Sequence, residues 1–233
     1  MNKWTSSKVR PLIALQEVTG EWKDDMEKIL LNNGYNNFSM NYGYNISYYI
    51  ILLIVAKEYT VLKINYINIG DLIKESNLLE EELFVNNFII ELILKDRKPF
   101  IFYNNHLPVP KINNSKLIEV LTIRERMCNM REYSIIWAGD FNIKPNSDIY
   151  NLILNSEFEN CNLKLESSYK SFHGSEPIMT THTKNFKDTL DYIFITKNIK
   201  CIYSKILQYN HLIMPNKYNP SDHLPLISFL ILK

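Results

Sequence analysis

Acids, amides and imidazoles recur at the ends of apolar segments in this sequence. They are Glu17 after PLIALQ, Asn104 and His106 after FIFY, Asp140 and Asn142 after YSIIWAG, Asp191 within TLDYIFI, and Asp222 and His223 before LPLISFLIL. Acidic side chains are rarely buried without a partner, and a divalent cation can satisfy several carboxylates at once. Mg²⁺ prefers hard oxygen ligands with water completing its shell, and Mn²⁺ is the alternative ion. The pattern predicts such a site, with the ligands Glu17, Asp140, Asn142 and Asp222.

The tetrapeptide GDFN offers two of these groups from adjoining positions. Asp140 and Asn142 are two residues apart, and in extended backbone this spacing points both side chains to the same side. Gly139 gives the backbone more freedom at that point. The motif can therefore present a carboxylate and an amide to one cluster of phosphate and metal. The alternative is that the two residues only cap a turn.

Asp191 lies inside an apolar segment and needs a group that neutralises it. His223 is the natural candidate, because a carboxylate that accepts a hydrogen bond from an imidazole fixes the tautomer and raises the basicity of the other nitrogen. Such a pair forms a general base that can take a proton from water. A structural histidine in an ordinary ion pair is the competing interpretation. His106 is likewise either a catalytic group or a histidine that happens to end a strand.

Short apolar segments must position these side chains. Segments of this length that are rich in β-branched and aromatic residues and bounded by turn residues are typical of buried strands. The predicted strands are residues 11–15, 48–56, 59–64, 88–94, 100–104, 133–139, 190–196, 200–207 and 224–232. Helical patterns predict helices at residues 21–32, 116–127 and 147–154. The expected fold class is therefore α/β (α+β), with many strands and few helices.

Length and composition favour one domain. The chain has 233 residues, 46% of them hydrophobic, and can bury one sizeable core. No repeat, low-complexity tract or linker divides it, which predicts a single domain over residues 1–233. The formal net charge of +1 disfavours duplex DNA and an anionic membrane as partners. The frequent Asn, Ile, Lys and Tyr residues are what AT-rich codons produce, which suggests a viral or protozoan source.

The cysteines and the apolar segments bear on the cellular compartment. Cys128, Cys161 and Cys201 are odd in number and lack C-x-x-C spacing, which argues against a disulfide framework or a zinc site and favours a reducing compartment. No segment resembles a signal peptide or reaches the ~20 apolar residues that span a bilayer. We therefore expect a cytoplasmic location.

Taken in order, the polar motifs resemble the signatures of the endonuclease/exonuclease/phosphatase (DNase I-like) superfamily. They are LQEV with Glu17, NNHL with His106, GDFN with Asp140 and Asn142, LDYIF with Asp191, and SDHLPL with Asp222 and His223. Each motif alone is weak, but the ordered set over residues 12–226 is strong. The segments GDFNIKPNSDIYNLI and LESSYKSFHGSEPIMTTHTKNFKDTLDYIF are similar to the deadenylase-like branch, which includes the carbon-catabolite-repressor deadenylases, nocturnin, the Angel proteins and 2′-phosphodiesterase.

The resemblance implies a four-layer sandwich, in which two mainly antiparallel β-sheets pack face to face with helices outside. It also implies a Mg²⁺-dependent phosphodiesterase that acts on RNA 3′ ends, with poly(A) or another oligoadenylate favoured. By position, Glu17 would bind the metal and Asp222 would complete the acidic cluster.

The remaining motif residues also receive roles from this resemblance. Asp140 and Asn142 would hold the scissile phosphate and the nucleophile or a second ion. His223, oriented by Asp191, would act as base or transition-state stabiliser. His106 would donate to a phosphoryl oxygen.

The sequence departs from the family pattern in two places. Family members have a strand with an Asn near the phosphate and then a helix before LQEV, whereas only a short segment precedes Glu17, so this first strand and helix are expected to be absent. Asn105 stands where the family often has Thr.

Two alternative functions stay open. One is the same chemistry on 2′,5′-oligoadenylate, a nucleotide cofactor, abasic DNA or a phosphoinositide, and the other is a non-catalytic module that holds RNA or a partner protein.

Overall fold

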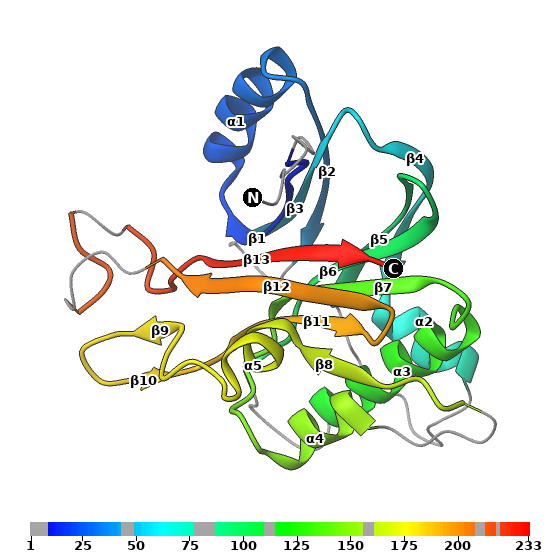
Figure 1. Ribbon diagram of the computed structural model, residues 1–233. Helices are drawn as coiled ribbons and strands as arrows, with labels where there is room; N and C mark the ends of the chain where they lie inside the picture. Colours follow the sequence, from blue (N-terminus) through cyan, green and yellow to red (C-terminus); the bar gives the residue numbers. More distant parts are fainter. Residues whose placement is uncertain are drawn as a thin grey trace, which may run out of the picture.

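The computed structural model describes residues 9–42, 49–76, 87–109, 115–155, 161–207, 213–217 and 220–233. The strands are β1 (Leu12–Val18), β2 (Tyr35–Tyr42), β3 (Tyr49–Ala56), β4 (Thr60–Asn68), β5 (Phe88–Lys95), β6 (Pro99–His106), β7 (Ser134–Asp140), β8 (Leu165–Ser167), β9 (Thr181–His182), β10 (Lys187–Asp188), β11 (Asp191–Thr196), β12 (Ile199–Ile206) and β13 (Leu226–Leu232). The helices are α1 (Gly20–Asn32), α2 (Ile69–Ser76), α3 (Ser115–Asn129), α4 (Asp148–Asn155) and α5 (Ser168–His173) (Figure 1).

The largest sheet has the strand order β4-β5-β6-β7-β11-β8. Its neighbours are antiparallel except β6 and β7, which run parallel. The central strands β5, β6 and β7 are buried over almost their whole length, as expected for continuous apolar segments. Because β6 and β7 are parallel, their carboxyl ends lie at the same edge of the sheet, and these ends are His106 and Asp140.

Two smaller antiparallel sheets cover one face of the large sheet. One has the order β1-β3-β2 and the other pairs β12 with β13. Both contribute to one hydrophobic cluster against the large sheet, which includes Leu53 of β3, Cys201 of β12 and Ile90 of β5. In β3, residues 50–56 are each at most 5% exposed, which confirms the buried strand predicted for that segment.

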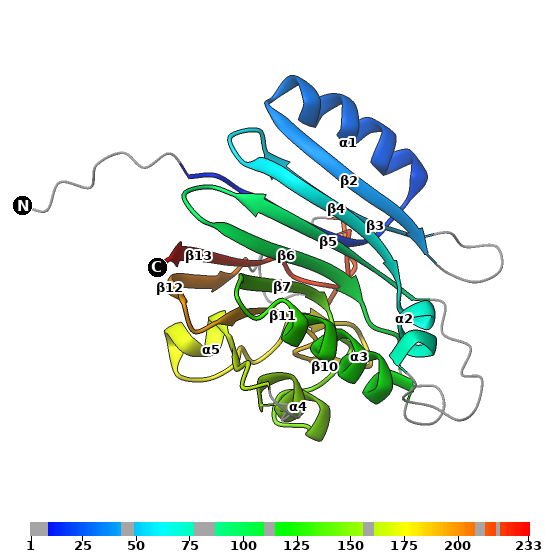
Figure 2. The ribbon, with the colours of Figure 1, turned by 90° about the vertical axis from the view of Figure 1, so that its right-hand side faces the viewer.

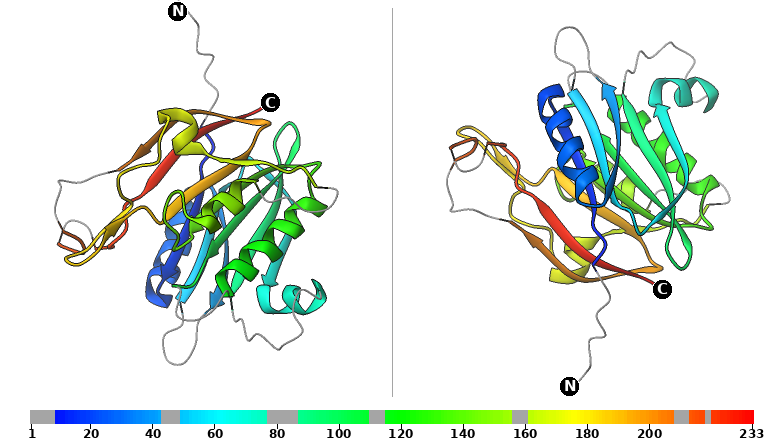
Figure 3. Two further views of the ribbon diagram at one scale, coloured as in Figure 1. Left: turned by 90° about the horizontal axis from the view of Figure 1, so that it is seen from below. Right: turned by 90° about the horizontal axis from the view of Figure 1, so that it is seen from above.

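Helices form the two outer layers. Met26 and Leu30 of α1 pack against the outer face of the β1-β3-β2 sheet. Helices α2, α3 and α4 pack against the opposite face of the large sheet, in a cluster that includes Val120, Trp137 and Tyr150. Figure 2 shows this order of helix, sheet, sheet and helix, and in Figure 3 α3 and α4 face the viewer from below, whereas α1 does so from above. The predicted four-layer sandwich is confirmed.

Most of the predicted elements are present. Each predicted strand has a counterpart, and the three predicted helices are α1, α3 and α4. Strand β2 was not predicted, because YNNFSMNY has no apolar run. The short elements α2, α5, β8, β9 and β10 were not predicted either. None of the described helices is both long enough and apolar enough to cross a membrane.

The prediction about the cysteines was wrong. Cys128, near the end of α3, forms a disulfide with Cys161, and their Cα atoms are 5.8 Å apart. The two cysteines are 33 residues apart in the sequence, so their spacing does not reveal that these segments meet. Cys201 is free and buried. The disulfide removes the argument that the cysteines gave for a reducing compartment.

Candidate active site

Three strands of the large sheet place three of the predicted residues in one row. β6 ends at His106, β7 ends at Asp140, and β11 begins at Asp191. Asp140 is the register partner of His106 in the parallel ladder and of Asp191 in the antiparallel ladder. Partners in neighbouring strands project their side chains to the same face of a sheet. The strand register therefore brings these residues together, although 85 residues of sequence separate the first from the last.

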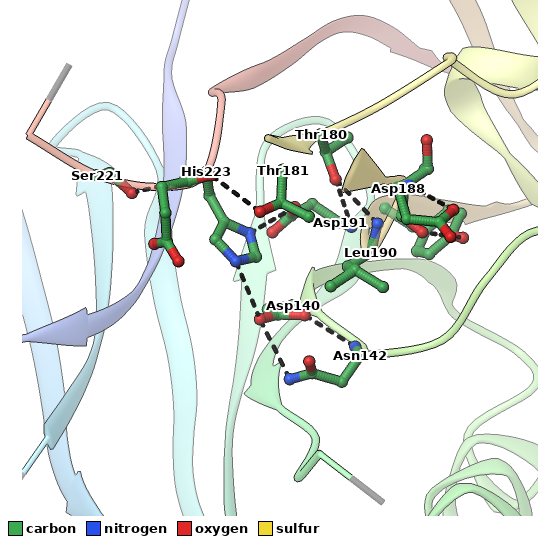
Figure 4. Close-up of polar contacts among 12 residues, drawn as sticks. Asp140, Asn142, Thr180, Thr181, Asp188, Leu190, Asp191, Ser221 and His223 are labelled. Carbon is green, nitrogen blue, oxygen red and sulfur yellow. Dashed lines mark hydrogen bonds and ion pairs between the residues drawn. The ribbon is translucent and has the colours of Figure 1, made fainter. Parts of the chain in front are cut away.

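His223 reaches this row from the loop before β13. Its Nδ1 atom lies 2.8 Å from Oδ2 of Asp191 and donates to it, and its Nε2 atom lies 3.9 Å from Oδ2 of Asp140 (Figure 4). Asp140, Asp191 and His223 each offer a ligand atom within 4.8 Å of the others. The predicted contact between Asp191 and His223 is thus present, and it leaves Nε2 directed at the site.

Two threonines hold these groups in place. The hydroxyl of the buried Thr180 accepts a hydrogen bond of 3.1 Å from the backbone N–H of Asp191. Thr181 forms an isolated β-bridge with His223, and its hydroxyl donates to the carbonyl of Asp222 at 2.9 Å (Figure 4). Sequence reasoning missed this role. The signal that could have found it is the pair of adjacent threonines in the segment that resembles the family.

Asn142 joins the site by a different geometry from the one predicted. Extended backbone was the wrong expectation, because β7 ends at Asp140 and Asn142 has a left-handed φ of 49°. The backbone N–H of Asn142 donates to Oδ1 of Asp140 at 2.8 Å. Its Nδ2 atom donates to the carbonyl of Leu107 at 2.9 Å and lies 3.1 Å from Nε2 of His106. Asn142 therefore caps the turn and also orients both Asp140 and His106.

Glu17 and Asp222 lie at the rim of this cluster. The Oε1 atom of Glu17 is 3.9 Å from Nδ1 of His106, and 53% of the Glu17 side chain is exposed. Partial burial raises the pKa of Glu17, and so does the nearby charge of Asp222, while His223 opposes the rise. Each of the predicted site residues therefore lies in or beside one cluster.

The protonation states of the buried groups differ widely. Burial raises the pKa of Asp140 to about 7, helped by the charge of Asp191 and opposed by His223. Burial lowers the pKa of His106 to about 4, helped by the charge of His223. Burial also lowers the pKa of His223, but the hydrogen bond to Asp191 and the surrounding carboxylates outweigh it and raise this pKa to about 9. Such separation of pKa values in one cluster is typical of catalytic sites.

The donor set fits a divalent cation. Asp140 is only 7% exposed and lies beside a second carboxylate, so its ionised form needs a positive charge nearby. Among the described residues, Asp140, Asp191 and His223 form a group of possible ligands, and two of the four predicted ligands, Glu17 and Asp222, are not part of it. Carboxylates favour a hard ion such as Mg²⁺ or Mn²⁺.

Lys116 is a site residue that the sequence did not indicate. It is 4% exposed, and its Nζ donates to the backbone carbonyl of Asn142. Burial lowers its pKa to about 8, while Asp140 and Glu119 oppose the change. A lysine within a helical pattern is usually a solvated residue, so nothing in the sequence distinguishes this one.

Comparison with known proteins identifies the family. The model of the Endonuclease/Exonuclease/phosphatase family matches residues 8–223. The chain belongs to this family. The resemblance predicted from the ordered motifs is thus confirmed.

The relatives that are similar in sequence include members of the deadenylase-like branch that the sequence motifs resemble. Carbon catabolite repressor protein 4 homolog 4 of Arabidopsis thaliana is 30% identical over 158 residues, which are 55% of this chain and 38% of that protein. Human 2′,5′-phosphodiesterase 12 is 25% identical over 179 residues, which are 66% of this chain and 29% of that protein. The chain therefore spans about a third of the length of these two relatives.

A solved structure shares the fold. The human Nocturnin catalytic domain with bound sulfate superimposes with a TM-score of 0.73 at 21% identity. The match covers 95% of this chain and 81% of that chain.

Proposed function

We propose that this chain is a Mg²⁺-dependent phosphodiesterase that hydrolyses the 3′ end of RNA, with a poly(A) or oligoadenylate end as the substrate. The observation that carries the proposal is the partly buried cluster in which His223, hydrogen-bonded to Asp191, faces the buried Asp140. Family membership supports hydrolysis of a phosphoester. Similarity to proteins named carbon catabolite repressor and 3′-5′-exoribonuclease supports RNA as the substrate.

The pKa values of the metal-free chain bear on the roles of Asp140 and His223. Burial raises the pKa of Asp140 to about 7, so a cation beside this carboxylate would favour its ionised form and use it as a ligand. With a pKa of about 9, His223 is mainly an imidazolium at pH 7, so Nε2–H can donate to a phosphoryl oxygen as negative charge develops. Of the two roles that the sequence suggested for His223, this protonation state favours the stabiliser.

His106 and Asn142 would contact the phosphoryl group on the other side of Asp140. His106 is neutral at pH 7, and its Nε2 lies against the side-chain amide of Asn142. The proton of His106 therefore belongs on Nδ1. This N–H faces Glu17 at 3.9 Å, and a phosphoryl oxygen beside it would accept a hydrogen bond from it.

Because Asp191 and His223 are hydrogen-bonded to each other, Asp140 is the member of that group of possible ligands left for the cation, and Glu17 and Asp222 at the rim would complete the set of ligands. Asn142 could offer its side-chain oxygen. When bound, Mg²⁺ supplies positive charge that stabilises a pentacovalent transition state and lowers the pKa of a bound water. The fold of this chain would set the position of the cation, because the three carboxylates come from β1, β7 and the loop before β13.

The test is digestion of 5′-labelled RNA with an oligo(A) tail in the presence of Mg²⁺. Wild type should shorten the tail from the 3′ end, and Asp140→Ala should reduce the rate by at least about 100-fold, the size expected when a group that acts in the transition state is lost. Asp96→Ala is the control, because Asp96 pairs with Arg10 far from the cluster. Equal rates for wild type and Asp140→Ala would refute the proposal.

A parallel digestion of 2′,5′-oligoadenylate separates the two nearest substrates. Human 2′,5′-phosphodiesterase 12 and ANGEL2, described as a 2′,3′-cyclic phosphatase, are similar to this chain, so related phosphoesters belong in the same assay. Faster cleavage of the 2′,5′ linkage would keep the chemistry but change the substrate. RNA binding without any cleavage would favour the non-catalytic module.

A further inference from the structure

Glu17 lies on a β-bulge that aims its side chain at the site. The ladder between β1 and β3 is regular up to the pair Leu15 and Leu52, and it then resumes at Val18 and Ile50. Two residues of β1, Gln16 and Glu17, therefore lie opposite one residue of β3. Glu17 has a left-handed φ of 56°, a conformation that residues other than glycine adopt only when their surroundings impose it. Bulges commonly redirect a side chain beside an active site.

One fully buried side chain binds the backbone of both strands at the pair where the bulge begins. Asn104 of β6 is 0% exposed, and its Nδ2 donates to the carbonyl oxygens of Leu15 and Leu52, each at 3.1 Å. Its Oδ1 accepts a hydrogen bond of 2.7 Å from Nε2 of Gln16. The orientation of the amide is fixed, because carbonyl oxygens can only accept. Asn104 thus ties the last regular pair of the ladder and the first bulged residue to the large sheet.

The Glu17 carboxylate depends on this backbone for its position. Its side chain is half-exposed, and the 3.9 Å separation from His106 is too long for a hydrogen bond that would fix its orientation. The main chain sets the direction of the Cα–Cβ bond of Glu17 and so decides which region its carboxylate can reach. The main chain here is directed by the bulge.

We propose that Asn104 is a positioning residue, which sets the place of the Glu17 carboxylate relative to Asp140 by locking the bulge of β1 onto β6. Strand β6 also ends in His106, so one strand fixes both sides of the gap between Glu17 and the histidine. The inference rests on the proposed function for the role of Glu17, but the contacts of Asn104 are independent of the substrate.

A double-mutant cycle tests this role. The proteins are wild type, Asn104→Ala, Glu17→Gln and the double variant, and the readouts are kcat and KM on oligo(A) RNA with Mg²⁺ and the affinity for Mn²⁺ by calorimetry. Asn104→Ala should lower kcat by on the order of 10-fold to 100-fold, because small misplacements of catalytic groups cost this much. It should weaken Mn²⁺ binding and change KM little. In the Glu17→Gln background it should cause no further loss, because contacting residues that act together are not additive.

Two variants separate positioning from general destabilisation. Asn87→Ala removes another buried asparagine, whose Nδ2 donates to Glu119 at 2.8 Å, and it should lower the melting temperature without lowering kcat. Gln16→Ala removes only one of the three hydrogen bonds that the Asn104 side chain makes. It should give a smaller loss of kcat that also vanishes in the Glu17→Gln background. This milder variant keeps the test valid if Asn104→Ala does not fold.

The outcomes separate this inference from the proposed function. If wild type leaves oligo(A) RNA intact but binds Mn²⁺ more tightly than Asn104→Ala does, the proposed substrate is wrong and the positioning role stands. Equal Mn²⁺ affinities would overturn the positioning role, as would losses that multiply in the double variant. A wild-type chain that binds no Mn²⁺ and cleaves nothing would overturn both.

Discussion

Replacing Asp191 by Asn should strongly lower the pKa of His223. The side-chain oxygen of Asn can still accept from Nδ1–H of His223, so the substitution removes the negative charge and keeps the shape. In wild type, Asp191 and the other carboxylates raise the His223 pKa from 6.5 to about 9 against the effect of burial. This rise corresponds to ~3 kcal/mol in favour of the imidazolium, since each pKa unit is worth about 1.4 kcal/mol. Without the Asp191 charge, we expect a pKa of roughly 7 or below.

The pH dependence of stability follows from the same shift. The folded pKa of His223 lies above its unfolded value, so the stabilisation is fully present below about pH 6.5 and is lost as the pH rises through about 9. The free energy of unfolding of metal-free wild type should therefore exceed that of Asp191→Asn most clearly near pH 6. The difference should shrink steadily toward pH 9.

NMR titration of the His223 ring protons in EDTA measures the pKa directly, and urea denaturation at several pH values measures the stability. Asp188→Asn is the matched control, because Asp188 pairs with Lys144 at 2.7 Å and not with a histidine. A wild-type pKa near 6.5, or the same pKa in wild type and Asp191→Asn, would refute the reasoning.

Three further predictions concern the framework of the site and its ion. Gly139→Ala should lower the free energy of unfolding by about 1–3 kcal/mol in urea denaturation, because the added Cβ would overlap the carbonyl oxygen of Asn105 and force the backbone to move; an unchanged midpoint would contradict this. Reduction of the Cys128–Cys161 disulfide, which closes a loop of 33 residues, should lower the free energy of unfolding by about 3–4 kcal/mol, and equal urea curves with and without reductant would speak against it. Because the pKa of Asp140 is raised from 3.8 to about 7, its contribution to stability is present below pH 3.8 and lost as the pH rises through about 7. Thermal unfolding in EDTA should show this decline and Mg²⁺ should reduce it, so parallel pH profiles would count against a metal at Asp140.

The strands and the family were predictable from the sequence, because both depend on local patterns. Apolar runs such as FIIELIL and YSIIWAG are long enough to indicate buried strands without knowledge of their neighbours. Strand β2 lacks this signal, since YNNFSMNY is mostly polar, and it forms a strand by pairing with the apolar β3. Tertiary pairing therefore decides its conformation, which the local sequence does not encode.

The sequence motifs indicated many residues of the cluster, such as Asp140, Asp191 and His106, but they gave no sign of Lys116. The row that Asp140, Asp191 and His106 form depends on the strand register, which the spacing of residues along the sequence does not determine. The left-handed backbone of Asn142 and the contacts of Asn104 likewise depend on segments distant in the chain. The Cys128–Cys161 disulfide was missed for the same reason, because it joins two segments that are distant in the sequence.

The most direct test of the central claim is anomalous diffraction from crystals of this chain soaked in Mn²⁺. In the proposed centre, Glu17, Asp140 and Asp222 hold a divalent cation beside His106 and His223. The account predicts an anomalous peak in direct contact with the carboxylate of Asp140 and adjacent to Glu17. A crystal with no peak at this cluster, or with Mn²⁺ bound only at other surfaces of the chain, would contradict it.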